Sequence, residues 1–375
     1  MAAALKSIVA PTASTLSNPT LEAEVPIEIF PVPQSRSVHG NAFPLGIRVK
    51  EGHQFQDIDA AVRRIEELAQ TGLFDGLLQS HGTILFRGFP VKTASDFSKF
   101  VKAFRLPQPH REIGLSGKRT TINDAVKTAN EEPPDVKFYY HSEYGRSAHF
   151  PGVLFFFSEI VPEQGGQTPL LSSLELYDRL RAEMPEFAHD LETKVSPSSL
   201  FAASGKIELN NSRQDSYGFD IQAGDSLDVQ RSKVEAVLKQ DLQAEAEWQP
   251  NGALHVLQKL PAIRRIQSTG KATFFNGFAG VYGRARDNDA LKSPYRGLDG
   301  KYHLPTTYGD GSPIPTAYLD RLLDLSDEIG FLVPWEAGDV ALIDNYTVQH
   351  ARSPWVGKRS LLVSLWDGRE KFAPF

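Results

Sequence analysis

The segment from residue 338 to 366 holds a dense series of strand-like patterns, and it constrains the fold more than any other part of the chain. Gly338-Asp339 precedes the apolar run Val340 to Ile343, a second pattern covers Tyr346 to His350, and Arg359 to Trp366 alternates apolar and polar residues. Strand patterns also occur earlier, as at Thr83 to Arg87, with helical patterns between. This order favours a β-sandwich or jelly roll over alternating β-α-β units. We therefore expect a mostly β fold with α-helices, namely a double-stranded β-helix (jelly roll) core with surrounding helices.

The helices and remaining strands are predicted from apolar periodicity and capping residues. We expect an amphipathic helix or helix pair from Asp57 to Ser80, a helix capped near Thr93 or Ser95, and a helix capped by Ser172 or Ser173. Further segments are a strand at Val153 to Ile160, a short strand at Thr168 to Ser172, a helix opened by Pro185, a charged helix at Ser232 to Leu242, strands at Ile263 to Gln267 and Ala272 to Phe275, and a helix at Pro315 to Ile329.

Three segments fall outside this regular pattern. Residues 1–35 contain five prolines and read as an extended N-terminal arm, which leaves 36–375 as a single domain. Residues 106–134 are rich in Gly, Pro and Thr without periodicity, which is typical of a functional loop, and we interpret them as a lid over a site. The region of about 185–260 is expected to be a helical insertion.

The chain of 375 residues contains no cysteine. Disulfides, thiolate zinc sites, iron–sulfur clusters and cysteine nucleophiles are therefore excluded. Any metal must be held by imidazole and carboxylate groups, which 10 His and 46 acidic residues can supply.

Charge and hydropathy point to a small-molecule partner. The net charge is −6 and basic residues form no sustained run, so we expect neither nucleic acid nor a membrane as partner. The longest apolar stretch, Val153 to Phe157, is far shorter than the ~20 residues that span a bilayer. We expect a cytoplasmic protein, with an organellar transit segment at the N-terminus as the alternative; the oligomeric state is left open.

The most distinctive local motif is His141-Ser142-Glu143. On an extended segment residues i and i+2 share a face, so this imidazole and this carboxylate can converge on one cation. His350 and, nine residues later, Arg359 lie in the terminal β region. Two histidines and one carboxylate on one side of a metal are typical of non-haem Fe(II) oxygenases. The plain alternatives are a core histidine at 350 and an ion pair of Arg359 with Asp339 or Asp344.

These segments together resemble a known family. His141-Ser-Glu143, Gly165-Gly-Gln-Thr168-Pro169 and Gly338-Asp-Val-x-Leu-Ile-Asp-Asn345 with His350 and Arg359 are similar to the taurine dioxygenase-like family of Fe(II)/2-oxoglutarate-dependent oxygenases. The resemblance is strongest to the clavaminate synthase-like branch, whose metal carboxylate is Glu. It extends to Leu85-Phe-Arg-Gly-Phe-Pro90, Ala129-Asn-Glu131 with Pro133-Pro134, and Gly309-Asp-Gly311, and so covers the chain from about residue 40 onward.

The resemblance implies a role for each matching residue. His141, Glu143 and His350 would be the catalytic centre and the ligands of Fe(II), while Thr168 and Arg359 would bind the distal carboxylate of 2-oxoglutarate, with O2 as the second co-substrate. The second arginine that some members carry four residues after the first is replaced by Val363. A sulfonate substrate held in that manner is therefore not expected.

Substrate contacts are less determined by the sequence. Our candidates are Asn130, Tyr140, Arg111 and Asn276, the last with a turn-forming asparagine as the alternative. Lys118, Arg119 and Arg352 are further cations of this region, which we interpret as solvated loop residues.

The function implied is oxidation of an unactivated C–H bond in a small, polar, amino-acid-like substrate of specialised metabolism, with release of succinate and CO2. Hydroxylation, desaturation and cyclisation all remain open. One alternative is a metal-dependent hydrolase with the same ligands, which has no need of Thr168 and Arg359. The others are a catalytically inactive binding protein of the same fold, which would be expected to have lost a ligand, and a purely structural β-sandwich.

Overall fold

A seven-stranded sheet joins strands from both ends of the chain. The computed structural model describes residues 26–114, 119–129, 132–194, 205–206, 217–250, 252–258 and 260–373. The strand order is β1 (Ile27–Phe30), β4 (Leu45–Val49), β5 (Thr83–Arg87), β17 (Val340–Asp344), β8 (Val153–Ile160), β20 (Ser360–Trp366) and β6 (Lys127–Thr128). Strands β4 and β5 are parallel, and the other neighbours are antiparallel. The strands predicted at 83–87, 153–160 and 340–343 are confirmed, and the one predicted at 359–366 begins one residue later.

The end of the expected N-terminal arm is part of this sheet. Ile27–Phe30 pairs along its length with residues 46–49 of β4, and Phe30 is buried. The prolines at 26, 31 and 33 flank this strand without interrupting it, which is where a strand tolerates proline. The earlier part of the predicted arm lies outside the described residues.

A smaller sheet packs against the first. Its order is β16 (Phe331–Leu332), β10 (Pro169–Ser172), β18 (Val348–Arg352) and β7 (Phe138–His141). Buried side chains of both sheets belong to one apolar cluster, including Leu154, Ala341 and Val363 from the large sheet and Leu170 and Val348 from the small one. The two sheets therefore meet face to face, as in a sandwich.

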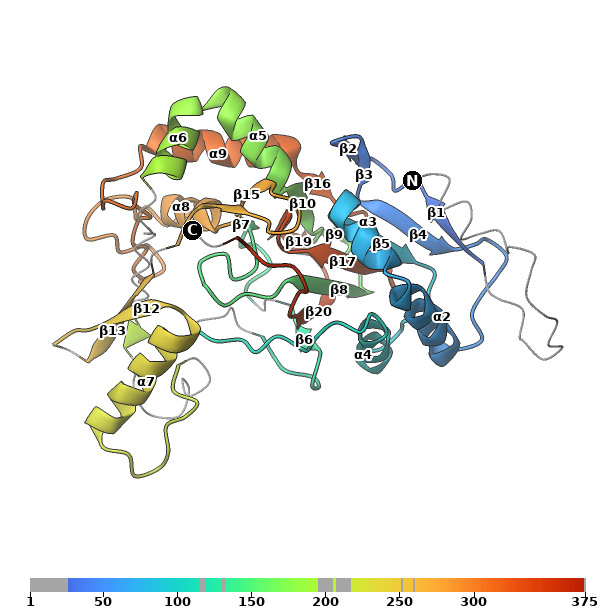
Figure 1. Ribbon diagram of the computed structural model, residues 1–375, viewed down its shortest axis with the longest axis horizontal. Helices are drawn as coiled ribbons and strands as arrows, with labels where there is room; N and C mark the ends of the chain where they lie inside the picture. Colours follow the sequence, from blue (N-terminus) through green and yellow to red (C-terminus); the bar gives the residue numbers. More distant parts are fainter. Residues whose placement is uncertain are drawn as a thin grey trace.

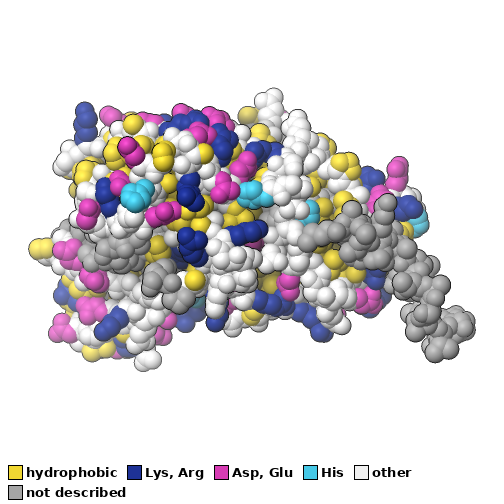
Figure 2. Space-filling view, turned by 45° about the horizontal axis from the view of Figure 1, so that its top comes forward, with side chains coloured by type: hydrophobic (Ala, Val, Ile, Leu, Met, Phe, Trp, Pro, Cys, Tyr) yellow, Lys and Arg dark blue, Asp and Glu magenta, His cyan; other side chains and the backbone are white. Residues whose placement is uncertain are grey.

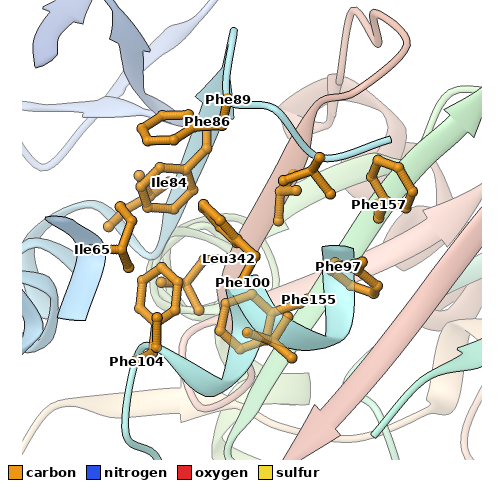
Figure 3. Packing of buried hydrophobic residues seen from close by; sticks show 14 of the residues in the cluster. Ile65, Ile84, Phe86, Phe89, Phe97, Phe100, Phe104, Phe155, Phe157 and Leu342 are labelled. Carbon is orange, nitrogen blue, oxygen red and sulfur yellow. The ribbon is translucent and has the colours of Figure 1, made fainter. Parts of the chain in front are cut away.

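The outer face of the large sheet is covered by three helices, α2 (Ile58–Gln70), α3 (Leu73–His81) and α4 (Ala94–Lys102) (Figure 1). The predicted helix pair is confirmed, and Thr93 caps α4 in a capping box with Asp96. Beneath these helices lies a cluster rich in phenylalanine (Figure 3). Phe86 makes ring contacts at 5.5–5.7 Å with four members, Phe74, Phe89, Phe100 and Phe104. Such edge-on aromatic pairs add to the free energy gained by burial alone.

The outer face of the small sheet is covered by a second helical layer (Figure 1). It consists of α5 (Ser173–Glu183), α6 (Pro185–Thr193), α8 (Phe278–Asp287) and α9 (Thr316–Ile329). Ser172 caps α5 as expected. Helix α6 shares this cluster through Phe187 and Leu191, so it belongs to the main body and not to an insertion beginning at 185.

A separate unit is built by the middle of the chain. Helix α7 (Leu227–Asp241) packs on a sheet of β11 (Gly205–Lys206), β13 (Ala253–Gln258) and β12 (Ala244–Trp248), with its own apolar cluster. It lies at the lower left of Figure 1. Three two-stranded sheets complete the described structure: β2 (Arg36–Val38) with β3 (Asn41–Phe43), β9 (Gln164–Gly165) with β19 (Trp355–Val356), and β14 (Ile263–Arg265) with β15 (Ala272–Phe274).

The surface is mixed in character. Acidic and basic side chains are interspersed over the face drawn in Figure 2, with small apolar areas between them. Among the described residues, no helix has both the length and the apolar character needed to cross a membrane.

Candidate active site

His141, Glu143 and His350 lie together at the edge of the small sheet. His141 ends β7 and is the direct cross-strand partner of His350 on β18, with ring centroids 4.5 Å apart. Glu143 follows β7 by two residues, and its Oε2 lies 3.2 Å from Nε2 of His350 and 4.0 Å from Nε2 of His141. One ligand atom from each of the three lies within 4.8 Å of the others.

Hydrogen bonds and strand pairing hold each of these groups in place. Nδ1 of His141 lies 2.9 Å from the carbonyl oxygen of Tyr139, so it serves as the donor and Nε2 carries the lone pair. The side chain of Asn345 accepts a hydrogen bond from the Glu143 N–H at 2.8 Å and donates one to the Glu143 carbonyl at 2.9 Å. His350 lies on a strand that is paired on both sides, opposite Leu170 of β10 and His141 of β7.

The protonation states suit a cation. Burial and the neighbouring His350 lower the pKa of His141 to about 4, so its imidazole is neutral at pH 7. Burial alone would raise the pKa of Glu143, but the charge of Arg119 and the two imidazoles outweigh it and hold the pKa well below its usual range. The group therefore presents the neutral imidazole of His141 and a carboxylate, with the ring of His350 beside both.

A metal ion fits this donor set. Oε2 of Glu143 is buried, faces both imidazoles and receives no hydrogen bond from the described residues, and an unpartnered buried oxygen of this kind is costly. Within the described part of the chain no other His, Asp or Glu joins the group. Two nitrogens and one oxygen with further positions open are typical of non-haem Fe(II).

Arg359 lies beside the segment that contains Thr168. Its Nε donates to the carbonyl of Gly166 at 3.0 Å, and its guanidinium lies over the ring of Trp355 at 5.0 Å. Gly166 has φ +70°, and a Cβ there would meet Arg359 at 3.1 Å, so glycine allows this close approach. Thr168 is buried, and its hydroxyl accepts a hydrogen bond from Nε1 of Trp335 at 3.2 Å.

The alternative for Arg359, an ion pair with Asp339 or Asp344, does not form. Asp339 pairs with Arg87 at 2.7 Å, and Asp344 accepts from Thr347 at 2.7 Å. No described carboxylate lies within 4.0 Å of the Arg359 guanidinium, although burial and the nearby Arg352 lower its pKa to about 10. A half-buried guanidinium that pairs with no described carboxylate can bind an anionic ligand.

The substrate candidates are not brought together in the same way. Tyr140 is buried in the helical cluster with its hydroxyl against Gly330, and Arg111 stacks on the ring of Phe219 at 3.9 Å. Both ends of the Asn276 amide bond the backbone, donating to Ala262 and accepting from Phe278, which favours the structural alternative. Asn130 and Lys118 lie outside the described residues.

Three residues have structural roles that the sequence did not reveal. Arg352 and Arg119 were expected to be solvated. Arg352 is instead buried and donates to the carbonyls of residues 132, 133 and 136. Arg119 contacts Glu143 at 2.9 Å, and its side chain is only 11% exposed. Asn345 is the last residue of the Gly338–Asn345 motif, and this motif was the sequence signal for its role. Nothing in the residues beside Arg119 distinguishes it from an exposed loop arginine.

The two histidines and one glutamate at the edge of the small sheet form the donor set of the non-haem iron oxygenases, and this defines the class of the site. The chain belongs to the family described as taurine catabolism dioxygenase TauD, TfdA, whose model matches residues 49–366. It is therefore an oxidoreductase of the dioxygenase type that uses Fe(II) and 2-oxoglutarate.

Two relatives illustrate the similarity. A clavaminate synthase-like protein of Arabidopsis thaliana is 32% identical over 363 residues, which cover 92% of this chain and 99% of the relative. The dapdiamide synthesis protein DdaC of Enterobacter agglomerans is 24% identical over 306 residues, covering 81% and 87%.

Solved structures also match over most of their length. A taurine dioxygenase from Burkholderia xenovorans aligns with a TM-score of 0.48 and 13% identity, covering 93% of this chain and 95% of the other. PvcB, an Fe, α-ketoglutarate dependent oxygenase from an isonitrile synthetic pathway, aligns with a TM-score of 0.46 and 15% identity, covering 94% and 95%.

Proposed function

We propose that His141, Glu143 and His350 hold the iron, that Arg359 and Thr168 bind the distal carboxylate of 2-oxoglutarate, and that the enzyme oxidises an unactivated C–H bond of a small, polar, amino-acid-like substrate. The observation that carries this proposal is the cross-strand pairing of His141 with His350, with one oxygen of Glu143 directed at both rings. We assign the two packed sheets to a double-stranded β-helix core and the 106–134 loop to its lid, apart from β6 (Lys127–Thr128), which belongs to the large sheet.

When bound, Fe(II) and 2-oxoglutarate supply the oxidising chemistry, in which O2 is consumed, 2-oxoglutarate becomes succinate and CO2, and a substrate C–H bond is oxidised. The protein positions and shields the reactants. Arg359 supplies the charge for the carboxylate, and Thr168, which Trp335 holds through its hydroxyl oxygen, can donate its own proton to the same group. Phe156 packs edge-on against His350 at 5.3 Å and keeps water from that side of the ring.

The substrate class rests on two supports. The sequence lacks the second arginine expected for a sulfonate, because Val363 occupies that position. The side chain of Val363 lies in the apolar core between the two sheets. The names of the two relatives, a clavaminate synthase-like protein and a dapdiamide synthesis protein, point to synthesis rather than degradation. We accordingly place the reaction in specialised metabolism, with hydroxylation, desaturation or cyclisation as its outcome.

The test is a screen for succinate formation. Protein loaded with Fe(II) is supplied with 2-oxoglutarate, O2 and a panel of free amino acids and small peptides. The masses of the products are determined by mass spectrometry. A substrate that stimulates succinate formation should gain one oxygen or lose two hydrogens. Turnover that requires Zn(II) and proceeds without 2-oxoglutarate would instead establish the metal-dependent hydrolase.

A further inference from the structure

Arg119, in the 106–134 loop, reaches the carboxylate of the metal centre. One guanidinium nitrogen lies 2.9 Å from Oε1 of Glu143, and a second lies 2.9 Å from Oε1 of Glu112. The side chains of Arg119, Glu112 and Glu143 are 11%, 9% and 7% exposed, so both ion pairs are shielded from water. Pairs of this kind have far more influence on geometry than exposed ones.

The two oxygens of Glu143 have different partners. Oε1 is held by Arg119, whereas Oε2 faces Nε2 of His350 at 3.2 Å and Nε2 of His141 at 4.0 Å. The carboxylate is thereby turned so that a single oxygen points toward the place between the imidazoles. A carboxylate free to rotate could offer both oxygens to a metal and would take up a position that a co-substrate needs.

We propose that Arg119 is a positioning residue for the metal carboxylate: by binding Oε1 it limits Glu143 to one oxygen at the metal and keeps the remaining positions open for 2-oxoglutarate and O2. This inference rests on the proposed function. It also gives the 106–134 loop a specific task, because the residue that holds the metal carboxylate lies in this loop and not on a strand of either sheet.

The surroundings of Glu112 explain why an arginine is needed. Glu112 also binds Lys127 and accepts a hydrogen bond from the hydroxyl of Tyr144 at 3.0 Å. Glu112 is therefore fixed independently and holds the far side of the guanidinium in place. The planar fork of arginine can bridge two carboxylates at once, whereas the single ammonium of lysine cannot reproduce that geometry.

The competing explanation is that Arg119 only fastens the loop to the body. The two explanations differ in what happens at the metal. If Arg119 only anchors the loop, its substitution changes thermal stability alone. If Arg119 positions Glu143, its substitution also changes the coordination of the metal and the affinity for the co-substrate.

The experiment uses the full chain loaded with Co(II), whose visible absorption reports coordination, under anaerobic conditions. Arg119→Gln and Arg119→Lys are compared with Lys102→Met, which removes another ion pair of the same loop, that of Lys102 with Asp124 at 2.8 Å, and leaves the pairs of Glu112 and Glu143 in place. We expect Arg119→Gln to change the Co(II) spectrum and to weaken 2-oxoglutarate binding to the Co(II) protein by about tenfold to a hundredfold, the usual effect of removing a partner of a metal ligand. Arg119→Lys should recover part of the loss, and Lys102→Met should match the wild type in both measurements.

Unchanged spectra and unchanged 2-oxoglutarate affinity in Arg119→Gln, with only a lower melting temperature, would overturn the inference and show that Arg119 only anchors the loop. If Arg119→Gln does not fold, Arg119→Lys decides, because wild-type behaviour there would be equally contrary. Failure of the proposed function is distinguishable, since it would appear in the wild type itself as no spectral response of the Co(II) protein to 2-oxoglutarate.

Discussion

Strand β8 places the same residue type in two different environments. Phe155 and Phe157 point into the phenylalanine cluster beneath α2–α4, where Phe155 meets Phe104 at 5.1 Å and Phe157 meets Phe97 at 5.3 Å. Phe156, between them, points the other way and packs against His350. The alternation of a strand thus separates the region that stabilises the fold from the region that carries the chemistry.

The two regions also differ in redundancy. In the phenylalanine cluster the stabilising contacts are shared among many rings, and Phe86 alone contacts four others. In the His/Glu/His group each ligand atom has a single task, and no second residue can take it over within the described structure. Substitutions in the two regions should therefore separate activity from stability.

The largest effect is expected from Glu143→Gln, which removes the negative charge but nearly keeps the shape. We expect turnover to fall by more than about a hundredfold, the upper range for residues that merely support a ligand. The protein should still fold, at a lower melting temperature, because Arg119 loses one of its two carboxylate partners and keeps Glu112. Succinate release and thermal unfolding are the two measurements. Full turnover in this variant would remove Glu143 from the ligand set.

The second largest effect should be on stability, from Phe155→Ala. Truncating a fully buried phenylalanine costs about 3–5 kcal/mol of unfolding free energy, which denaturant unfolding can measure. The matched variant Phe156→Ala on the opposite face should also destabilise, but it alone should alter metal and 2-oxoglutarate binding by the folded protein. If Phe155→Ala alters them equally, the separation of the two faces does not hold.

Arg359→Ala tests the co-substrate end of the site. Removing a charge that pairs with a carboxylate in a shielded site costs at least about 2 kcal/mol, which corresponds to a roughly thirtyfold higher requirement for 2-oxoglutarate. Metal affinity should remain as in the wild type, because Arg359 is not among the ligands. An equal loss of both affinities would indicate misfolding, and Arg359→Lys serves as the control that retains the charge.

The last prediction concerns the pH dependence of stability and leaves the metal site untouched. Burial raises the pKa of Asp344, at the end of β17, to about 6, whereas an unfolded aspartate ionises near 3.9. Between these values the folded protein holds a proton that the unfolded chain has released, so stability is lost as the pH rises from 4 to 7. Asp344→Asn should remove this loss. Unfolding free energies of both proteins at the two pH values should therefore diverge, and parallel values would contradict the assignment.

The sequence predicted what depends on local signals. The caps at Thr93 and Ser172 and the apolar strand Val153–Ile160 follow from spacing and residue type. His141 and Glu143 do lie together, but Glu143 is in a turn after β7 and not on the extended segment that the prediction assumed. Helix α8 was missed because it contains Gly280 and Gly283, which weaken a helical pattern. The structure gives the reason for one of them, since a Cβ at Gly283 would collide with the ring of Tyr139 at 2.4 Å.

The remaining features depend on contacts between distant segments. The bond of Arg119 to Glu143 spans 24 positions in a region without periodicity, and the pairing of Arg87 with Asp339 spans 252. Because Asp339 pairs with Arg87, it does not form the ion pair with Arg359 that was the alternative from the sequence. Burial of a loop cation is set by such tertiary contacts and has no signature in the residues beside it.

The central claim is that His141, Glu143 and His350 hold a single iron beside a 2-oxoglutarate site. Anaerobic titration of the metal-free protein with Fe(II) in the presence of 2-oxoglutarate tests it most directly. We predict one iron per chain and a weak visible charge-transfer band, both of which are lost in His141→Ala. Absence of the band in the wild type, or the same iron binding in His141→Ala, would contradict the account.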